Sequence, residues 1–246
     1  PVAQSKQAEQ VLIVGDSHLD QSPLKRRFQE YLTTPSSCHS FHSYENGKNP
    51  IISAVKLVEH SNYQPETLVI QIIERSLLAS ALDFVASRDL SDPLRPKVWK
   101  QRTNTVPYRI DNGIAASLTF LGITNSWFNN HRCLTLKTTN SPPLYHNHLI
   151  LLLSKVFNNR KKPEETQSII RDLTVRLHDI LDPKNIEFLL YVIPDKETVY
   201  TDFFDSKKLP ASFLEYDSLP LEVISPVNEL KHAVNKGEME VFKYSD

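Results

Sequence analysis

The chain has few cysteines, no excess of charge of either sign and no apolar run long enough to cross a membrane. It contains two cysteines, Cys38 and Cys133, whose spacing fits no zinc or redox motif. They could pair, but two separate thiols are the favoured interpretation. A net charge of −1 gives no argument for binding to nucleic acid or to an anionic membrane surface. The apolar segment 149–157 is far too short to span a bilayer.

The sequence also lacks a starting methionine, a signal-like segment, repeats and low-complexity stretches. We therefore expect a processed form, with any targeting segment outside the given residues. A chain of 246 residues can bury a sizeable core as one large α/β domain or two small ones. We expect a single domain over 1–246, with 1–10 a flexible lead-in and about 91–140 an irregular insertion or cap.

Apolar patterns typical of strands alternate with patterns typical of helices. Continuous apolar runs and two weaker patterns predict strands over 11–14, 67–73, 186–193, 219–224 and 240–244. Helical spacing predicts helices over 24–32, 51–60, 77–86, 145–157, 163–181 and 227–235. The sequence Pro-Ser-Ser-Cys at 35–38 is typical of a loop. This alternation indicates a three-layer α/β fold, with a doubly wound, mostly parallel sheet and helices on both faces.

The most informative segment is an apolar strand that ends abruptly at Gly15-Asp16-Ser17. Ser22 is a candidate N-cap for the helix that follows, so the segment predicts strand, turn and helix. Such a unit places its turn at the carboxyl edge of a sheet, where open α/β folds bind ligands. A nearby helix N-terminus favours developing negative charge. Ser17 is therefore a candidate nucleophile, although Gly, Asp and Ser also suit an ordinary polar turn.

Polar residues also follow two further strands: Glu74-Arg75 after the second and Asp246 after the last. Arg75 is a candidate for binding an anion or an oxyanion, with Glu74 holding it by an ion pair. A purely structural salt bridge is an equal alternative. A nucleophilic serine needs a base, usually a histidine oriented by a carboxylate. No histidine is selected as that base; we expect His18 to line the pocket, and no set of metal ligands emerges.

Four segments carry a resemblance to a known family: VLIVGDSHLD (11–20), LVIQIIERSL (68–77), YVIPDKETVY (191–200) and VFKYSD (241–246). The first resembles the opening block of the SGNH/GDSL hydrolase superfamily, whose serine is the nucleophile. The second and third resemble the Glu-Arg strand and the Pro-Ser/Asp-Lys-x-x-Val-Tyr segment of bacterial polysaccharide O-acetyltransferases of the alginate-acetylation type. The fourth resembles the lead into their Asp-Thr-His-Trp motif and stops at its aspartate.

The resemblance implies an SGNH fold and an acyl ester, usually acetyl, on Ser17. It implies that Asp246 orients a histidine just beyond the given residues. The backbone N–H of Ser17 and Arg75 would stabilise the oxyanion, with Gly15, Asp16, His18 and Glu74 around the site. It further implies no metal or cofactor, a polysaccharide acceptor, an acetyl donor supplied by a membrane acyltransferase partner, and a periplasmic or other extracytoplasmic location, with any membrane anchor outside this sequence.

Two departures from the alginate-type pattern are visible. The Gly-Asp-Ser block comes first, which is the order of the wider superfamily, and Glu74-Arg75 stands where that superfamily has a Gly-x-Asn block. The given chain is expected to be nearly inactive, because a serine without its base loses most of its advantage. Two alternatives stay open. One is a non-catalytic member that binds glycan or a partner in an acetylation complex; the other is a soluble lipase or thioesterase of the same fold.

Overall fold

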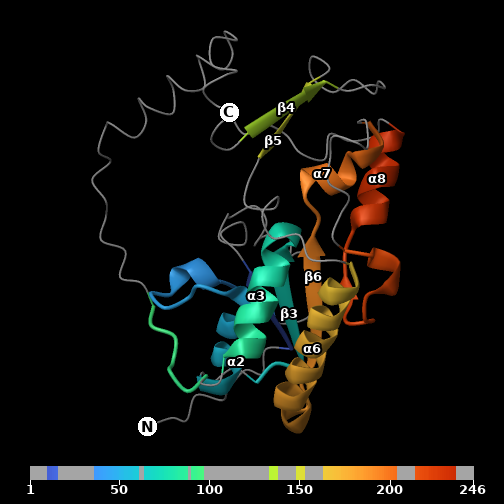
Figure 1. Cartoon of the computed structure of the whole chain (residues 1–246). Helices are drawn as coiled ribbons and strands as arrows, with labels where there is room; N and C mark the ends of the chain where they lie inside the picture. The colour runs from blue at the N-terminus through green and yellow to red at the C-terminus, as the bar shows by residue number, and fades with distance from the viewer. Residues whose placement is uncertain are drawn as a thin grey trace, which may run out of the picture. The chain divides into compact units, whose positions relative to one another are not determined.

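The computed structural model of the chain describes residues 10–15, 36–60, 64–87, 90–96, 133–137, 148–152, 163–203 and 214–236. The chain divides into two compact units. The first comprises Pro1–Lys97, Lys161–Asp195 and Ser212–Leu230; the second comprises Val98–Arg160, Lys196–Ala211 and Lys231–Asp246. A large sheet with its helices belongs to the first unit, and a two-stranded sheet belongs to the second (Figure 1).

A five-stranded sheet, parallel throughout, forms the centre of the first unit. From one edge to the other its strands are β2 (Ser36–Ser40), β1 (Val11–Gly15), β3 (Thr67–Ile73), β6 (Glu187–Ile193) and β7 (Val223–Ile224). Counted within this sheet the order is 2-1-3-4-5, in which the chain leaves the first strand toward one edge and later returns to its other side. The predicted α/β class with a parallel sheet is confirmed.

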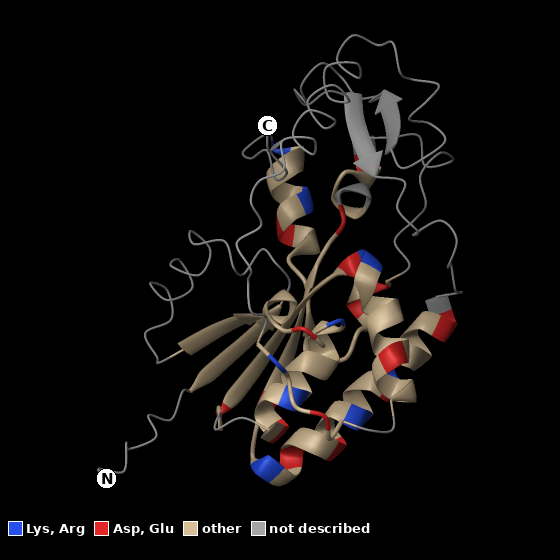
Figure 2. Ribbon diagram, turned by 90° about the vertical axis from the view of Figure 1, so that its left-hand side faces the viewer, with Lys and Arg blue, Asp and Glu red and all other residues tan. Residues whose placement is uncertain are grey.

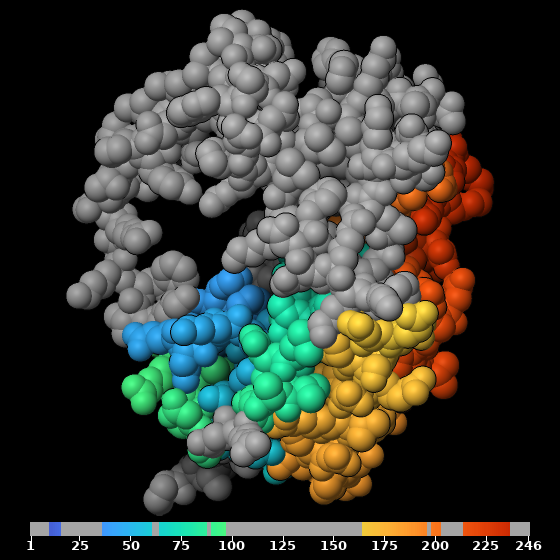
Figure 3. Space-filling model, in the orientation of Figure 1, coloured from blue at the N-terminus to red at the C-terminus, as the bar shows by residue number. Residues whose placement is uncertain are grey.

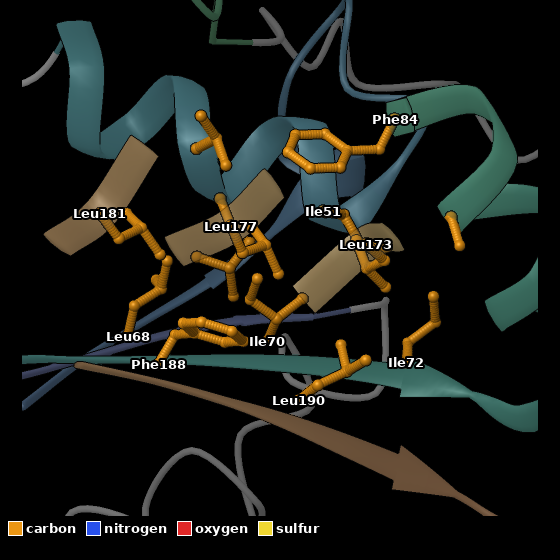
Figure 4. Close-up of a cluster of buried hydrophobic side chains, with 14 of the residues drawn as sticks. Ile51, Leu68, Ile70, Ile72, Phe84, Leu173, Leu177, Leu181, Phe188 and Leu190 are labelled. Atoms are coloured by element: carbon orange, nitrogen blue, oxygen red, sulfur yellow. The ribbon is translucent and has the colours of Figure 1, made fainter. Parts of the chain in front are cut away.

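Three helices cover one face of this sheet: α2 (Pro50–His60), α3 (Glu74–Ala86) and α6 (Pro163–Leu181) (Figures 1 and 2). Because side chains alternate along a strand, every second strand residue faces these helices. The core between the two layers includes Leu68, Ile70, Ile72, Phe188 and Leu190 from strands and Ile51, Phe84, Leu173, Leu177 and Leu181 from helices (Figure 4). Each such burial contributes about 1.5–3 kcal/mol, which makes this layer the main source of stability.

Local sequence explains how these helices begin and pack. Asn49 caps α2: its Oδ1 accepts hydrogen bonds from the N–H groups of Ile51 at 2.9 Å and Ile52 at 3.3 Å. The helices α3 and α6 lie side by side (Figure 3). Arg176 of α6 stacks over the Phe84 ring, 4.8 Å from its centroid, and donates hydrogen bonds to carbonyl oxygens at the end of α3. These contacts satisfy backbone groups that a helix C-terminus leaves unpaired.

The opposite face of the sheet carries a smaller apolar cluster. Ile13 and Cys38 are buried there, with Val11 and Val69 packed against them. Cys38 is a buried thiol, in line with the interpretation of two separate cysteines. The helix predicted over 24–32 lies outside the described residues. The prediction of helices on both faces is therefore confirmed only for the face that α2, α3 and α6 cover.

The second unit contains β4 (Cys133–Lys137) and β5 (His148–Leu152), which pair antiparallel, and the short helix α7 (Lys196–Val199). The helix α8 (Val227–Asn235) begins in the first unit and ends in the second. No helix within the described stretches is long and apolar enough to cross a bilayer.

Two predictions from the sequence are wrong. A helix was predicted over 145–157, but His148–Leu152 of this segment form strand β5. A short apolar run is compatible with a helix or a strand, and the pairing with β4 selects the strand. The loop predicted over 35–38 overlaps strand β2. Its serine-rich sequence has little strand character, but its backbone pairs with β1 along the whole strand.

Other predictions differ only in their limits. The helix α3 begins at Glu74 and not at residue 77, and the strand predicted over 219–224 is the two-residue β7. The predicted irregular region 91–140 contains strand β4, while its residues 97–132 and 138–140 lie outside the described ones. The predictions for α2, β3, α6, β6 and α8 are confirmed to within a residue. The strand predicted over 240–244 is outside the described residues.

Candidate functional site

The strands β1, β3 and β6 run parallel, so their carboxyl ends lie at the same edge of the sheet. Gly15 is the last residue of β1 and is buried. On one side β1 pairs with the edge strand β2, and on the other side it pairs with β3. The boundary between β1 and β3 is therefore the switch point of the strand order, where doubly wound sheets bind their ligands. Gly15 lies at the position that the sequence predicted.

Glu74, Arg75 and Asp195 form a polar cluster at this edge. Glu74 and Arg75 open α3 directly after β3, and Asp195 follows β6. Arg75 Nη1 donates a hydrogen bond to Asp195 Oδ1 at 2.7 Å, and the Asp195 N–H donates to Glu74 Oε2 at 2.8 Å. Glu74 is 1% exposed and Asp195 is 7% exposed, whereas the Arg75 side chain is 35% exposed. The cluster ties the ends of two neighbouring strands together.

This geometry corrects one prediction and adds one residue. The ion pair that the structure shows for Arg75 is with Asp195, whereas the sequence predicted Glu74 as its partner. Glu74 and Arg75 are neighbours at a helix start, where successive side chains point in different directions, so Glu74 reaches the Asp195 backbone. Sequence reasoning missed Asp195 as a site residue. The available signal was its place two residues after the third buried strand, inside the segment YVIPDKETVY (191–200).

The charges in the cluster decide what it can do. Two carboxylates accompany one guanidinium, and the N-terminus of α3 adds partial positive charge. Ile73, the N-cap of α3, has an apolar side chain that cannot cap the helix. Glu74 is the acidic residue in the first turn of α3. A guanidinium carries several N–H donors, and the contact with Asp195 uses Nη1. The partly exposed Arg75 can therefore also donate to the oxygen of a ligand.

A row of polar residues crosses the sheet at the level of Gly15. Gly15 pairs with Ser40 of β2, and Gln71 of β3 pairs with Tyr191 of β6. Gln71 stands beside Gly15, because the preceding residues of the two strands, Val14 and Ile70, are partners. Gln71 is 6% exposed, and its Oε1 has no hydrogen-bond partner among the described residues.

Tyr191 contributes a neutral phenol to this row. Burial raises the pKa of Tyr191 above its usual 10.0, and the negative Glu229 of α8 raises it further. Both causes disfavour the phenolate, so the hydroxyl keeps its proton at physiological pH. The row is therefore a set of neutral hydrogen-bonding groups next to the charged cluster.

A second titratable cluster lies elsewhere, on α6. His178 Nδ1 is 3.1 Å from Asp182 Oδ1, and His178 Nε2 is 3.2 Å from Glu222 Oε1. Its ring meets Phe188 edge-on near the start of β6, away from the carboxyl edge. Because carboxylates only accept hydrogen bonds, both contacts require a doubly protonated ring. The hydrogen bond to Asp182 raises the pKa of His178, burial lowers it, and the bond to Glu222 raises it, with a net upward shift.

This cluster predicts a pH-dependent stability. The charged ring contributes fully below the unfolded pKa of 6.5, and the contribution is lost as the pH rises through the higher folded pKa. We expect the stability difference between the protein and His178→Gln to shrink over that range. The ring is 42% exposed, and solvent screening limits the change to about 1 kcal/mol or less. Urea unfolding at several pH values measures the difference, and a difference that stays constant with pH would contradict the assignment.

The structure brings Gly15, Glu74 and Arg75 to one edge of the sheet, as predicted. The other predicted site residues, Asp16, Ser17, His18 and Asp246, lie outside the described residues. Within the described part of the chain, no group of three or more His, Cys, Asp or Glu side chains is arranged to hold a metal ion. Compared with known proteins, the chain matches no family model, no curated protein and no solved structure.

Proposed function

We propose that the protein is an extracytoplasmic SGNH-type O-acyltransferase or esterase that moves an acetyl group to or from a cell-surface polysaccharide through an ester on Ser17. The observation that carries the proposal is the position of Gly15 at the switch point of a parallel sheet. Ser17 follows Gly15 by two residues, so its Cα lies within about 7 Å of the Gly15 Cα. We therefore place the reacting serine at the edge that also carries Arg75.

The reaction has two steps. In the first, Ser17 Oγ forms a bond to the acyl carbon of the donor, the donor's own C–O bond breaks, and the leaving oxygen takes the serine proton. In the second, a sugar hydroxyl or water attacks the serine ester, and its proton returns to Ser17 Oγ. A histidine oriented by Asp246 carries the proton between the partners. Gly15, Asp16 and His18 line the site.

Both steps place negative charge on the acyl oxygen, and we assign its stabilisation to the backbone N–H of Ser17 and to Arg75. Loss of one such donor typically costs about 10²–10³ in rate. The ion pair with Asp195 supports this role, because a donor that is oriented in advance needs no reorganisation during the reaction. Glu74 holds the backbone of Asp195 and so supports the same arrangement.

The remaining parts of the proposal come from the resemblance. The acceptor is a polysaccharide, a membrane acyltransferase partner supplies the acetyl group, and no cofactor takes part. The location is the periplasm or another extracytoplasmic space.

The test is detection of the acyl-enzyme. Full-length protein mixed with p-nitrophenyl acetate and quenched in acid is expected to gain the mass of one acetyl group. Peptide mapping should find that group on the peptide that contains Ser17. An acetyl group found only on lysine side chains would contradict the proposal, since exposed amines react with this ester without catalysis.

A non-catalytic, glycan-binding member of an acetylation complex is the second candidate. The observation that favours it is the ion pair itself, since Asp195 and Glu74 together give Arg75 a sufficient structural role. Equal glycan binding by the protein and by Ser17→Ala, with no acyl-enzyme, would support this candidate.

A further inference from the structure

Two side chains of helix α6 hold the segment that leads into the edge strand β7. Gln167 donates hydrogen bonds from Nε2 to Glu215 Oε2 at 2.7 Å and to Ser218 Oγ. Further along the helix, His178 Nε2 lies 3.2 Å from Oε1 of Glu222, the residue before β7. The segment 215–222 is therefore held to α6 near both of its ends.

Glu222 joins the second of these contacts to the sheet. Its side chain meets His178, and its carbonyl oxygen accepts a hydrogen bond from the Leu190 N–H at 2.7 Å. Leu190 belongs to β6 and is the partner of Val223 in β7. Because β7 is only two residues long, few backbone hydrogen bonds keep it paired. The attachment of β7 therefore depends on how firmly Glu222 is held.

The His178 ring holds Glu222 most firmly when both ring nitrogens carry a proton. Its Nδ1 is 3.1 Å from Asp182 Oδ1, so each nitrogen faces a carboxylate oxygen that can only accept. A neutral ring has one N–H and no charge, so the contact with Glu222 loses either its proton or its charge assistance. The hydrogen bond to Asp182 raises the pKa of His178 above 6.5, with burial opposing it and Glu222 adding to it.

The other elements packed against the ring add no competing charge to this contact. From β6 the ring meets the uncharged Phe188 side chain. Lys184, the cation of the 3₁₀ turn that begins at Asp182, is paired with Glu59 of α2 at 3.1 Å. The protonation of the ring is therefore set by Asp182 and Glu222.

We propose that His178 is a pH-dependent latch at the edge of the sheet: the charged ring keeps β7 paired with β6, and loss of its charge lets β7 detach while the other strands stay paired. Detachment removes the acceptor of the Leu190 N–H and makes β6 the edge strand. The proposal does not depend on any reaction at Ser17.

The experiment measures hydrogen exchange at the Leu190 amide by NMR, in the full-length protein and in His178→Gln, from about pH 5.5 to about pH 9. Glutamine is a neutral donor that does not titrate, so it stands in for the neutral ring. Near the lower limit we expect the variant to exchange up to about fivefold faster, because the ring is 42% exposed and solvent screens the contact. As the pH rises through the folded pKa, the ratio of the two rates should fall to one.

Urea separates local detachment from global unfolding. Detachment of a two-residue strand exposes little surface, so exchange at Leu190 should barely respond to low concentrations of urea. Amides of β3 at the centre of the sheet should exchange faster as urea is added, because they exchange through global unfolding.

Gln167→Ala is the matched control, since Gln167 holds the same segment without a group that titrates. We expect this variant to speed exchange at Leu190 by the same factor at every pH. Asp182→Asn removes the main cause of the raised pKa of His178 and should move the pH effect to lower pH.

The outcomes decide the proposal in either direction. A ratio that falls to one with rising pH, at a lower pH in Asp182→Asn, supports the latch. A ratio of parent to His178→Gln that does not change with pH overturns it. Exchange at Leu190 that responds to urea as strongly as the β3 amides also overturns it, because β7 would then detach only when the whole sheet unfolds.

Discussion

Replacing Ser17 by alanine is expected to lower the rate of p-nitrophenyl acetate hydrolysis by the full-length protein at least about 10³-fold. The physical reason is that the ester intermediate forms on the Ser17 hydroxyl, so that only binding and oxyanion stabilisation remain without it. Initial rates under saturating ester measure the effect. Far-UV circular dichroism and the urea midpoint confirm that the variant is folded.

Ser36→Ala is the matched control for this prediction. Ser36 begins β2 at the amino end of the sheet, far along the strand from Ser40, which pairs with Gly15. We expect this variant to keep the parent rate. Equal hydrolysis by the parent and Ser17→Ala would exclude Ser17 as the nucleophile and favour the glycan-binding candidate.

Replacing Glu74 by alanine is expected to lower the free energy of unfolding by about 3 kcal/mol, because the substitution leaves the buried Asp195 N–H without its acceptor and opens a cavity. Glu74 is 1% exposed, so water does not easily take its place. The variant Glu74→Gln keeps an oxygen that can accept from Asp195 and should lose only about 1 kcal/mol, mainly the interaction of the charge with the start of α3. Urea unfolding of each variant measures both losses.

Glu165→Ala is the matched control, since Glu165 is an exposed acid in the first turn of another helix, α6. We expect it to change the free energy of unfolding by no more than about 0.5 kcal/mol. If Glu74→Ala costs as little as this control, the hydrogen bond to Asp195 does not hold the strand ends together. The proposed support of Arg75 would then also fail.

Several elements were predictable because their signals are local. Asn49 and Pro50 mark the start of α2 by side-chain capping and a fixed backbone angle. The helix α6 shows one apolar face over nineteen residues, and β3 is a run of apolar residues apart from Thr67 and Gln71. In each case the residues that decide the structure are neighbours in the sequence.

The candidate site was predictable in part for the same reason. Gly15, Glu74 and Arg75 follow recognisable strands, and parallel pairing then brings strand ends to one edge. The contact of Arg75 with Asp195 was not predictable, because 120 residues separate them. The residues that lie beside Gln71 on the neighbouring strands were not predictable either, since the register of β3 against β1 and β6 decides them.

The amino-acid sequence by itself determined the alternation of strands and helices, their main limits and the polar strand ends, because propensities, caps and apolar periodicity act over a few residues. Only the tertiary structure decided that the serine-rich segment Ser36–Ser40 is a strand and that His148–Leu152 pairs with Cys133–Lys137. It also decided that Asp195 holds Arg75. These outcomes depend on backbone hydrogen bonds and ion pairs between distant segments, and such contacts have no local signature.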